Sequence, residues 1–218
     1  MWSKLSKKYE EKLRQIQEKM AKKVILEDKF PIPIKTVAGF DIAFSNDSAI
    51  TTGVVLDYKF LKVKEIKTIK TKVSFPYVPT FLTFREGPLI IKVYKKLKIK
   101  PDVILIDGQG ICHPLFCGIA SHVGVILEKP TIGVAKSRLV GEYQEPIKVG
   151  TCSPIKYQNK KVGYVYKSKW NCKPIFISPG HRVSVDTSLR ITKKCVRDNK
   201  LPEPIFLAHS ISNKIINT

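Results

Sequence analysis

Three apolar segments follow one another between residues 37 and 75, and this succession constrains the fold more than any other feature of the sequence. Each is rich in β-branched and aromatic residues: 37–44, 51–58 and 61–75. The links between them, 45–48 and 57–59, are short and polar or turn-prone. Strands joined so closely pair antiparallel, so we predict a three-stranded meander. In the third strand Leu61 and Val63 alternate with lysines, which predicts one wet, basic face, and a β-bulge is expected near 65–67, where the alternation falters.

The second half of the chain alternates predicted strands and helices. Residues 103–106 are an uninterrupted apolar run, which is typical of a central strand covered on both faces. The other expected elements are a loop at 75–88, helices at 89–97, 114–127 and 184–197, strands at 131–135, 162–167 and 175–178, and a turn at 201–204 followed by a short helix. Such alternation adds parallel strands. The predicted fold class is α/β: one domain over residues 1–218, with a mixed sheet of an antiparallel meander plus parallel strands, flanked by helices.

Residues 1–30 are predicted to carry an amphipathic helix over 2–23. Its apolar face consists of residues three and four positions apart: Trp2, Leu5, Tyr9, Leu13, Ile16 and Met20. Pro31 and Pro33 follow it and prevent its continuation. We expect this helix to dock on the core, and a basic helix on a membrane surface is the alternative.

The charge and the cysteines bound the class of protein. The net charge is +21, from 39 Lys and Arg against 18 Asp and Glu, which favours a nucleic-acid partner. A lysine-rich solvated surface is the alternative. Five cysteines without a CxxC pair argue against a disulfide framework or zinc ribbon and favour a reducing, cytoplasmic location. Charged residues interrupt the apolar runs up to Lys35, so we expect no signal peptide. No stretch is long and apolar enough to span a bilayer, and we expect no membrane partner.

Three carboxylates stand where an acidic side chain is costly or well placed for a ligand. Asp41 lies within an apolar strand, where a carboxylate needs a partner or a metal; an Asp on a polar strand face is the alternative. Asp107 closes the 103–106 strand with Gly108 behind it, where α/β folds place ligands; a turn Asp is the alternative. Glu86 precedes the predicted helix at 89–97, and a helix N-terminal acid is its alternative.

The order of these elements and carboxylates is informative as a set. Three strands, a helix and a strand, with Asp41, Glu86 and Asp107 on the first strand, the helix and the next strand, resemble the ribonuclease H-like nucleases. Three oxygen donors suit Mg²⁺, or Mn²⁺ as a substitute, better than zinc. One or two such ions promote attack by water and neutralise charge on a phosphodiester.

Longer motifs make the resemblance specific and extend it from residue 37 to residue 209. In chain order they are PYVPTFLTFREGP at 76–88, DGQGICHP at 107–114, ASHVG at 120–124, IGVAKS at 132–137, SPGHRVSVD at 178–186, and LPEP at 201–204 with Ala208 and His209. In type and order these motifs are similar to those of the endonuclease V family. The resemblance implies a ribonuclease H-like fold and Mg²⁺-dependent cleavage of the second phosphodiester bond 3′ to deoxyinosine in DNA, which initiates repair, with inosine in RNA as a further substrate class.

The same resemblance assigns the residues of the site. It implies that Asp41, Glu86 and Asp107 hold the metal and that His209 completes the catalytic set; an exposed histidine on a terminal helix is the alternative for His209. Lys136 is placed at the active site, where a lysine can hold the scissile phosphate or stabilise the leaving oxygen; an ordinary lysine at a strand end is the alternative.

Three further residues are assigned to the substrate. His113 and Gly110 fall near the inosine pocket, and a satisfied loop histidine is the alternative for His113. Tyr77 matches the family's wedge, because flanking prolines stiffen the loop and its aromatic tip can enter the base stack; an aromatic plug of the local core is the alternative.

The sequence departs from the family's pattern at a few positions and leaves rival functions open. Gln109 stands where histidine is frequent, and Leu115 and Phe116 stand where basic residues are frequent, although nearby lysines can compensate. His122 and His181 are interpreted as structural. Another ribonuclease H-like nuclease, such as a junction resolvase or strand-transfer enzyme, is one rival, and a non-catalytic nucleic-acid-binding protein is the other. A monomer is expected.

Overall fold

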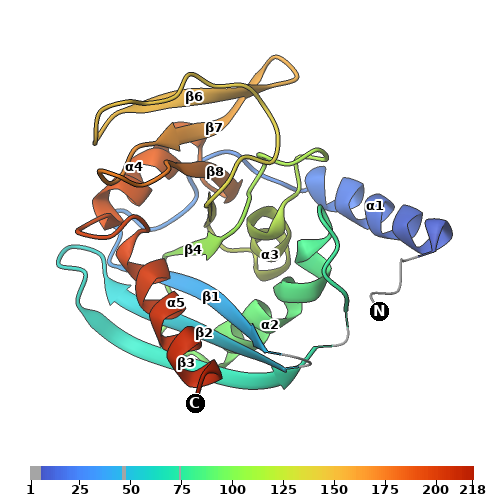
Figure 1. The fold of residues 1–218 in the computed structure, drawn as a ribbon, viewed down its shortest axis with the longest axis horizontal. Helices are drawn as coiled ribbons and strands as arrows, with labels where there is room; N and C mark the ends of the chain where they lie inside the picture. Colours follow the sequence, from blue (N-terminus) through green and yellow to red (C-terminus); the bar gives the residue numbers. More distant parts are fainter. Residues whose placement is uncertain (1–5, 46–47, 74) are drawn as a thin grey trace.

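An eight-stranded mixed sheet runs through the molecule, in the order β3-β2-β1-β4-β5-β8-β7-β6 (Figure 1). The computed structural model describes residues 6–45, 48–73 and 75–218. The strands are β1 (Thr36–Ser45), β2 (Ser48–Asp57), β3 (Val63–Lys72), β4 (Val103–Asp107), β5 (Thr131–Ala135), β6 (Cys152–Tyr157), β7 (Lys160–Tyr166) and β8 (Ile175–His181). The helices are α1 (Lys7–Ala21), α2 (Leu82–Lys96), α3 (Ile119–Leu127), α4 (Val185–Cys195) and α5 (Glu203–Ile216).

The pairing of the strands confirms the predicted fold class. β1, β2 and β3 form the antiparallel meander, and β4 joins β1 in parallel, followed by β5, also parallel. β8, β7 and β6 complete the sheet in antiparallel pairs. The register of β3 shifts at Lys64, between the partners of Val55 and Leu56, one residue before the predicted bulge.

Successive residues of the central strands point to two different cores, which explains why those strands are uninterrupted apolar runs. On one side Val37 and Leu105 pack with residues of α4 and α5, such as Ile191 and Ile205. On the other side Ala38 and Ile106 pack with α2 and α3. Helices therefore cover both faces of the central strands, as Figure 1 shows for α5 in front of β1 and β2.

Several predicted boundaries are wrong for identifiable reasons. α2 begins at Leu82 and not at residue 89, so Glu86 lies inside the helix and Pro88 is a helical residue. The Gly87–Pro88 pair is a helix-breaking signal, but burial of Thr83 and Leu89 outweighs it. The segment 114–118, predicted as the start of a helix, is loop up to Gly118, the N-cap of α3. β6 was not predicted because its short run contains Pro154, and α5 is longer than the short helix expected.

The N-terminal helix is present, but its predicted contact face is wrong in part. Leu13 and Gln17 are the buried residues of α1, while Tyr9 and Ile16 are 44% and 41% exposed. Trp2 and Leu5 lie outside the described residues. α1 packs beside α3 and buries Leu13 and Gln17. The rest of its predicted apolar face therefore remains in contact with solvent. Within the described residues, no helix combines the length and apolar character needed to cross a bilayer.

Candidate active site

A cleft of about 590 Å³ opens where β4 ends, between the sheet, α2 and α5. Seven of the eight residues predicted for the site line it: Asp41, Tyr77, Glu86, Asp107, His113, Lys136 and His209. Four of them come from β1, α2, β4 and α5, and the other three lie in loops, although 168 positions separate Asp41 from His209. The fold therefore brings together residues that the sequence could only group by family resemblance.

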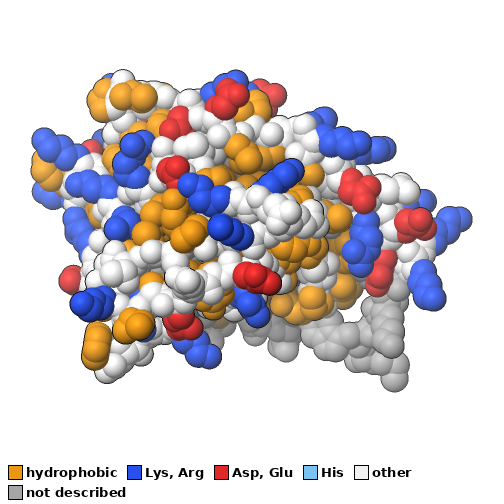
Figure 2. Space-filling view, turned by 90° about the horizontal axis from the view of Figure 1, so that it is seen from above, with side chains coloured by type: hydrophobic (Ala, Val, Ile, Leu, Met, Phe, Trp, Pro, Cys, Tyr) orange, Lys and Arg blue, Asp and Glu red, His pale blue; other side chains and the backbone are white. Residues whose placement is uncertain are grey.

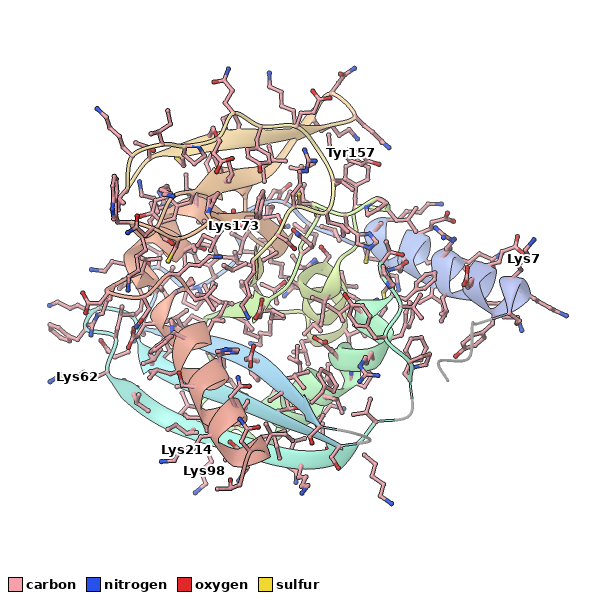
Figure 3. All side chains as sticks on the ribbon, in the orientation of Figure 1. Lys7, Lys62, Lys98, Tyr157, Lys173 and Lys214 are labelled. Carbon is pink, nitrogen blue, oxygen red and sulfur yellow. The ribbon has the colours of Figure 1, made fainter. Side chains whose placement is uncertain are left out.

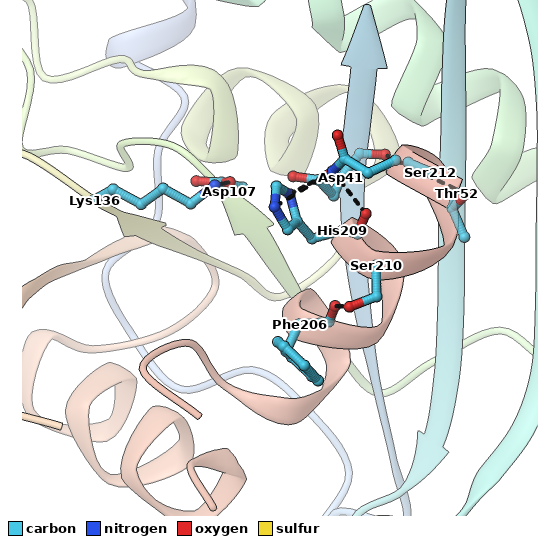
Figure 4. Close-up of polar contacts among 9 residues, drawn as sticks. Asp41, Thr52, Asp107, Lys136, Phe206, His209, Ser210 and Ser212 are labelled. Carbon is cyan, nitrogen blue, oxygen red and sulfur yellow. Dashed lines mark hydrogen bonds and ion pairs between the residues drawn. The ribbon is translucent and has the colours of Figure 1, made fainter. Parts of the chain in front are cut away.

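Two polar contacts, a His–Asp hydrogen bond and a Lys–Asp ion pair, organise the centre of the cleft (Figure 4). His209 Nδ1 lies 3.2 Å from Asp41 Oδ2, and Lys136 Nζ lies 2.5 Å from Asp107 Oδ2. The Asp41 side chain is 5% exposed, whereas those of Lys136 and His209 are 43% exposed. Each aspartate is thus in contact with one nitrogen-bearing side chain that is exposed enough to reach a ligand in the cleft.

Close packing of α5 on β1 holds His209 over Asp41. A Cβ atom at Gly39 would lie 2.1 Å from the Pro204 carbonyl carbon. The first turn of α5 can therefore pack this closely on β1 only because residue 39 is a glycine. One turn beyond His209, the Ser212 hydroxyl lies 2.9 Å from that of Thr52 on β2. The helix is therefore fixed to the first two strands both before and after its histidine.

Glu86 enters the cleft from α2 and is strongly affected by the other carboxylates. Burial raises the pKa of Glu86 to about 8, with Asp107 and Asp41 adding to the rise while Arg85 and Lys136 oppose it. Burial, followed by the charge of Asp107, raises the pKa of Asp41 to about 6, against the opposing effect of His209. Although burial opposes it, the charge of Asp107 raises the pKa of Lys136 above its ordinary value.

These effects show what kind of ligand the donor set fits. The charge of Asp107 raises the pKa of both Asp41 and Glu86, so these two groups ionise together beside it only when positive charge lies between them. Carboxylate oxygens are the donors that hard divalent cations prefer. Lys136 supplies one such charge beside Asp107. Among the described residues, no three His, Cys, Asp or Glu side chains stand together as a preformed metal cluster. The chemistry of the donors fits a divalent ion, and the carboxylates have to converge further to hold it.

The Tyr77 loop lies at the rim of the cleft. Tyr77 is 60% exposed, so it does not plug the local core. Phe81, at the end of the loop, is 1% exposed and anchors it, while Pro79 stays exposed. His113 is 3% exposed, with Nε2 3.1 Å from the Thr80 carbonyl and Nδ1 3.2 Å from the Leu115 N–H. These contacts fit a satisfied loop histidine, and a direct role for His113 at the base stays a prediction.

Gly110 is the predicted site residue that the structure does not bring to the cleft wall. Its N–H donates to the Ser178 hydroxyl at 2.9 Å, and a Cβ atom would lie 2.1 Å from the Pro179 oxygen. Gly110 thus permits close packing of the loop after β4 on β8. His122 and His181, interpreted as structural, are buried. The role of Gly110 toward substrate stays a prediction.

Several cleft residues were not identified from the sequence. Arg138 and Asn213 line the cleft, and the Asn213 amide donates to the His209 carbonyl at 2.9 Å. Their positions, two after Lys136 and one helical turn after His209, were the available signals. Arg85 lies over the Phe44 ring at 4.3 Å and donates to the Phe75 carbonyl. Arg85 does not line the cleft, but its charge opposes the rise in the pKa of the adjacent Glu86.

Positive charge is spread widely over the surface of the molecule. Figure 2 shows Lys and Arg side chains spread across the face seen from above rather than gathered into one patch. Figure 3 shows Lys7, Lys62 and Lys214 pointing outward from α1, the β2–β3 connection and α5. Lys160 lies 5.5 Å from the centre of the Phe116 ring. A lysine is therefore present beside Phe116, which stands where basic residues are frequent in the family. An approaching polyanion is attracted from many directions.

Comparison with known proteins decides the family. The sequence model of endonuclease V matches residues 18–210, most of the chain. The chain belongs to the endonuclease V family. Endonuclease V of Dictyoglomus turgidum is 43% identical over 96% of this chain and 92% of its own length. Among solved structures, endonuclease V of Bacillus subtilis superposes with a TM-score of 0.89 at 33% identity, covering 98% of this chain and 93% of that one.

Another endonuclease V structure contains nucleic acid. The Ciona intestinalis protein, solved with a 24mer DNA containing an inosine followed by a ribo-adenosine, has a TM-score of 0.84 and 31% identity, covering 96% of this chain and 98% of that one. The predicted resemblance is confirmed, and the chain is a nuclease, a hydrolytic enzyme. Membership of the endonuclease V family implies a divalent metal cofactor.

Proposed function

We propose that this protein is a Mg²⁺-dependent endonuclease that recognises deoxyinosine in DNA and cleaves the second phosphodiester bond on its 3′ side. The observation that carries the proposal is the convergence of Asp41, Glu86 and Asp107 on one cleft, with an exposed tyrosine at its rim. Acidic groups repel a phosphodiester unless a cation lies between them, so a binding protein without catalysis has little use for this cluster. The inosine-containing DNA in the Ciona intestinalis structure supports the choice of base.

The metal is assigned to the three carboxylates. Asp41 and Asp107 come from neighbouring parallel strands, Glu86 comes from α2, and the charges of both aspartates act on Glu86, which supports one shared ion. When bound, one or two Mg²⁺ ions promote attack by water and neutralise charge on the phosphodiester. Mn²⁺ has the same preference for oxygen donors and is expected to substitute.

The cations of the site act on the phosphodiester. Lys136, which lies beside Asp107 and is 43% exposed, would hold the scissile phosphate or stabilise the leaving oxygen. His209 keeps Asp41 oriented through the 3.2 Å contact and, being 43% exposed, is available for proton transfer at the cleft. Tyr77 is assigned as the wedge that fills the stack when the base leaves it, because it is exposed on a loop anchored at Phe81.

The assignment is tested by comparing cutting with binding. Asp41→Asn and Asp107→Asn should abolish Mg²⁺-dependent cutting of a labelled inosine-containing duplex, while each retains much of the metal-free affinity measured by fluorescence anisotropy. Asp198→Asn, an exposed carboxylate on the loop after α4, is the matched control and should cut like the parent. Cutting that survives in EDTA, or in either cleft variant, contradicts the metal assignment.

The choice between DNA and RNA needs its own measurement. Matched DNA and RNA strands, each with one inosine, should be cut under identical Mg²⁺ conditions and compared by kcat/KM. We assign DNA as the main substrate on the DNA-bound relative, and faster cutting of the RNA strand reverses that order.

A further inference from the structure

The Tyr77 loop ends in a strained residue whose carbonyl is held from two sides. Thr80 has a φ of 71°, a left-handed conformation that is costly for a β-branched side chain. Its carbonyl oxygen lies 2.7 Å from Gln17 Nε2 and 3.1 Å from His113 Nε2. Such a conformation persists only where the surroundings fix it, and here two hydrogen-bond donors do so.

The two donors come from different parts of the molecule. Leu115 donates its N–H to His113 Nδ1, so the proton of the neutral ring sits on Nε2 and points at Thr80. Burial lowers the pKa of His113 to about 4, so this neutral form is the one present near neutral pH. Gln17 belongs to α1, which stands at the side of the molecule next to the segment before α2 (Figure 1).

Gln17 is the polar one of the two buried residues of α1. Its side chain is 0% exposed, and its Oε1 has no hydrogen-bond partner in the described part of the chain. A buried amide with one unpaired atom is costly, so packing alone favours an apolar residue here. The Nε2 bond to the Thr80 carbonyl is what the amide contributes. Gln17 also lies just before the residues, 18–210, that the family's sequence model matches.

The loop is anchored at both ends, with Tyr77 between the anchors. At the downstream end Arg14 of α1 lies 5.4 Å from the centre of the buried Phe81 ring, beside Thr80. At the upstream end Arg85 donates to the Phe75 carbonyl. Tyr77 is 60% exposed and is held by its neighbours rather than by its own burial. Its direction is therefore set by the anchors.

We propose that α1 is a positioning element for base recognition and that Gln17, together with His113, clamps the Thr80 carbonyl so that Tyr77 is presented in one direction. The inference rests on the proposed function of Tyr77 as a wedge. Gln17 does not touch the substrate and acts through the loop. A wedge that samples several directions binds a distorted duplex less well, because ordering it costs affinity.

The test is a double-mutant cycle between Gln17 and Tyr77. Gln17→Met keeps the length of the side chain, removes the donor and also removes the unpaired oxygen, so folding should be retained. Affinity for an inosine-containing duplex should fall about two-fold to ten-fold, the range expected for one hydrogen bond. In a Tyr77→Ala background the same change should have almost no effect. Gln15→Met, exposed on the same helix, is the matched control and should bind like the parent.

Two further measurements separate positioning from folding. Cleavage of a single-stranded inosine substrate counts the active molecules in each preparation, and Gln17→Met should leave that count unchanged. Thr80→Gly should restore part of the duplex affinity in the Gln17→Met protein, because glycine adopts a positive φ without strain.

The outcomes distinguish the inference from the function on which it rests. If Tyr77→Ala weakens duplex binding but Gln17→Met does not, or if the two losses simply add, α1 does not act through Tyr77 and the inference is overturned alone. Equal losses on duplex and single strand overturn it as well. If Tyr77→Ala binds duplex like the parent, the wedge assignment and the inference both fall.

Discussion

The close contact between β1 and α5 can be tested with the substitution Gly39→Ala, which adds one methyl group between them. In Gly39→Ala the new carbon would lie 2.1 Å from the Pro204 carbonyl carbon and 2.4 Å from the Ile205 nitrogen. Carbon atoms in contact are separated by about 3.5 Å or more, so α5 must move away from β1 by more than about 1 Å. The atoms in the way are backbone, which cannot rotate aside as a side chain can.

Both stability and activity should respond to that movement. Overfilling a packed interior costs about 1–3 kcal/mol of unfolding free energy. His209 travels with the helix, so its 3.2 Å contact with Asp41 would open beyond hydrogen-bonding distance. A misplacement of about 1 Å in a catalytic group can lower the rate about a hundred-fold, so we expect a loss of that order in single-turnover cutting.

Gly87→Ala supplies the matched control. Its new Cβ would meet Thr83 Oγ1 at 3.5 Å and Val123 Cγ2 at 3.7 Å, which are ordinary contacts. Inside a helix this change should stabilise by about 0.5–1 kcal/mol and leave cutting unchanged. Urea unfolding and single-turnover cutting of an inosine-containing duplex measure both variants. A Gly39→Ala protein with the parent's urea midpoint and cutting rate would refute the packing of α5 described here.

Three other predictions concern pH, the wedge and salt. Folding raises the pKa of Glu86 from 4.5 to about 8 and that of Asp41 from 3.8 to about 6, so in the absence of metal these two groups hold more protons in the folded state than in the unfolded state. Burial lowers the pKa of His113 and His122 from 6.5 to about 4, which has the opposite effect between these values. From about pH 6.5 to 8 the effect of Glu86 remains, so the unfolding free energy should fall as pH rises in urea titrations, and Glu86→Gln should flatten that fall; an equal fall in the variant contradicts the assignment. Tyr77→Ala should weaken duplex binding about ten-fold to a hundred-fold, less on single strands, with little change in melting temperature. Early melting with normal cutting per folded molecule would instead make Tyr77 a core residue. If about six phosphates are neutralised, the logarithm of the DNA-binding constant plotted against the logarithm of the salt concentration should have a slope of about −5. A slope near zero would contradict a role of the +21 net charge in binding phosphates.

The strands were largely predictable from the sequence because their signals are local. The apolar runs and short links between residues 37 and 72 predict the meander, and the unbroken run before Asp107 predicts a central strand. Asp41 and Asp107 could be singled out because each interrupts or closes such a run. These are properties of a few adjacent residues, which a pattern can capture.

The rest of the site depends on contacts between distant segments, which no local pattern contains. The helix around Glu86 begins earlier than its Gly87–Pro88 pair suggests, because tertiary burial decides the boundary. His209 sits on an ordinary amphipathic helix, and the resemblance to the family was needed to notice it. The sequence places Gln17 on a polar helix face, and nothing near it in the sequence indicates its hydrogen bond to the Thr80 carbonyl.

The two edge strands of the sheet, β3 and β6, affect whether copies of this enzyme associate. An edge strand offers unpaired N–H and C=O groups to any neighbouring chain. At β6, Pro154 lacks an N–H, and a bridge between Glu142 and Lys156 covers part of the edge. At the other edge β3 carries a row of lysines: Lys64, Lys67, Lys70 and Lys72.

Two molecules approaching through β3 would bring these lysine rows together, and like charges facing each other oppose the pairing. The charge that attracts a nucleic acid therefore also keeps copies of the enzyme apart. Salt screens both effects over the same distances. A buffer concentrated enough to release the substrate thus also removes this protection against edge-to-edge aggregation.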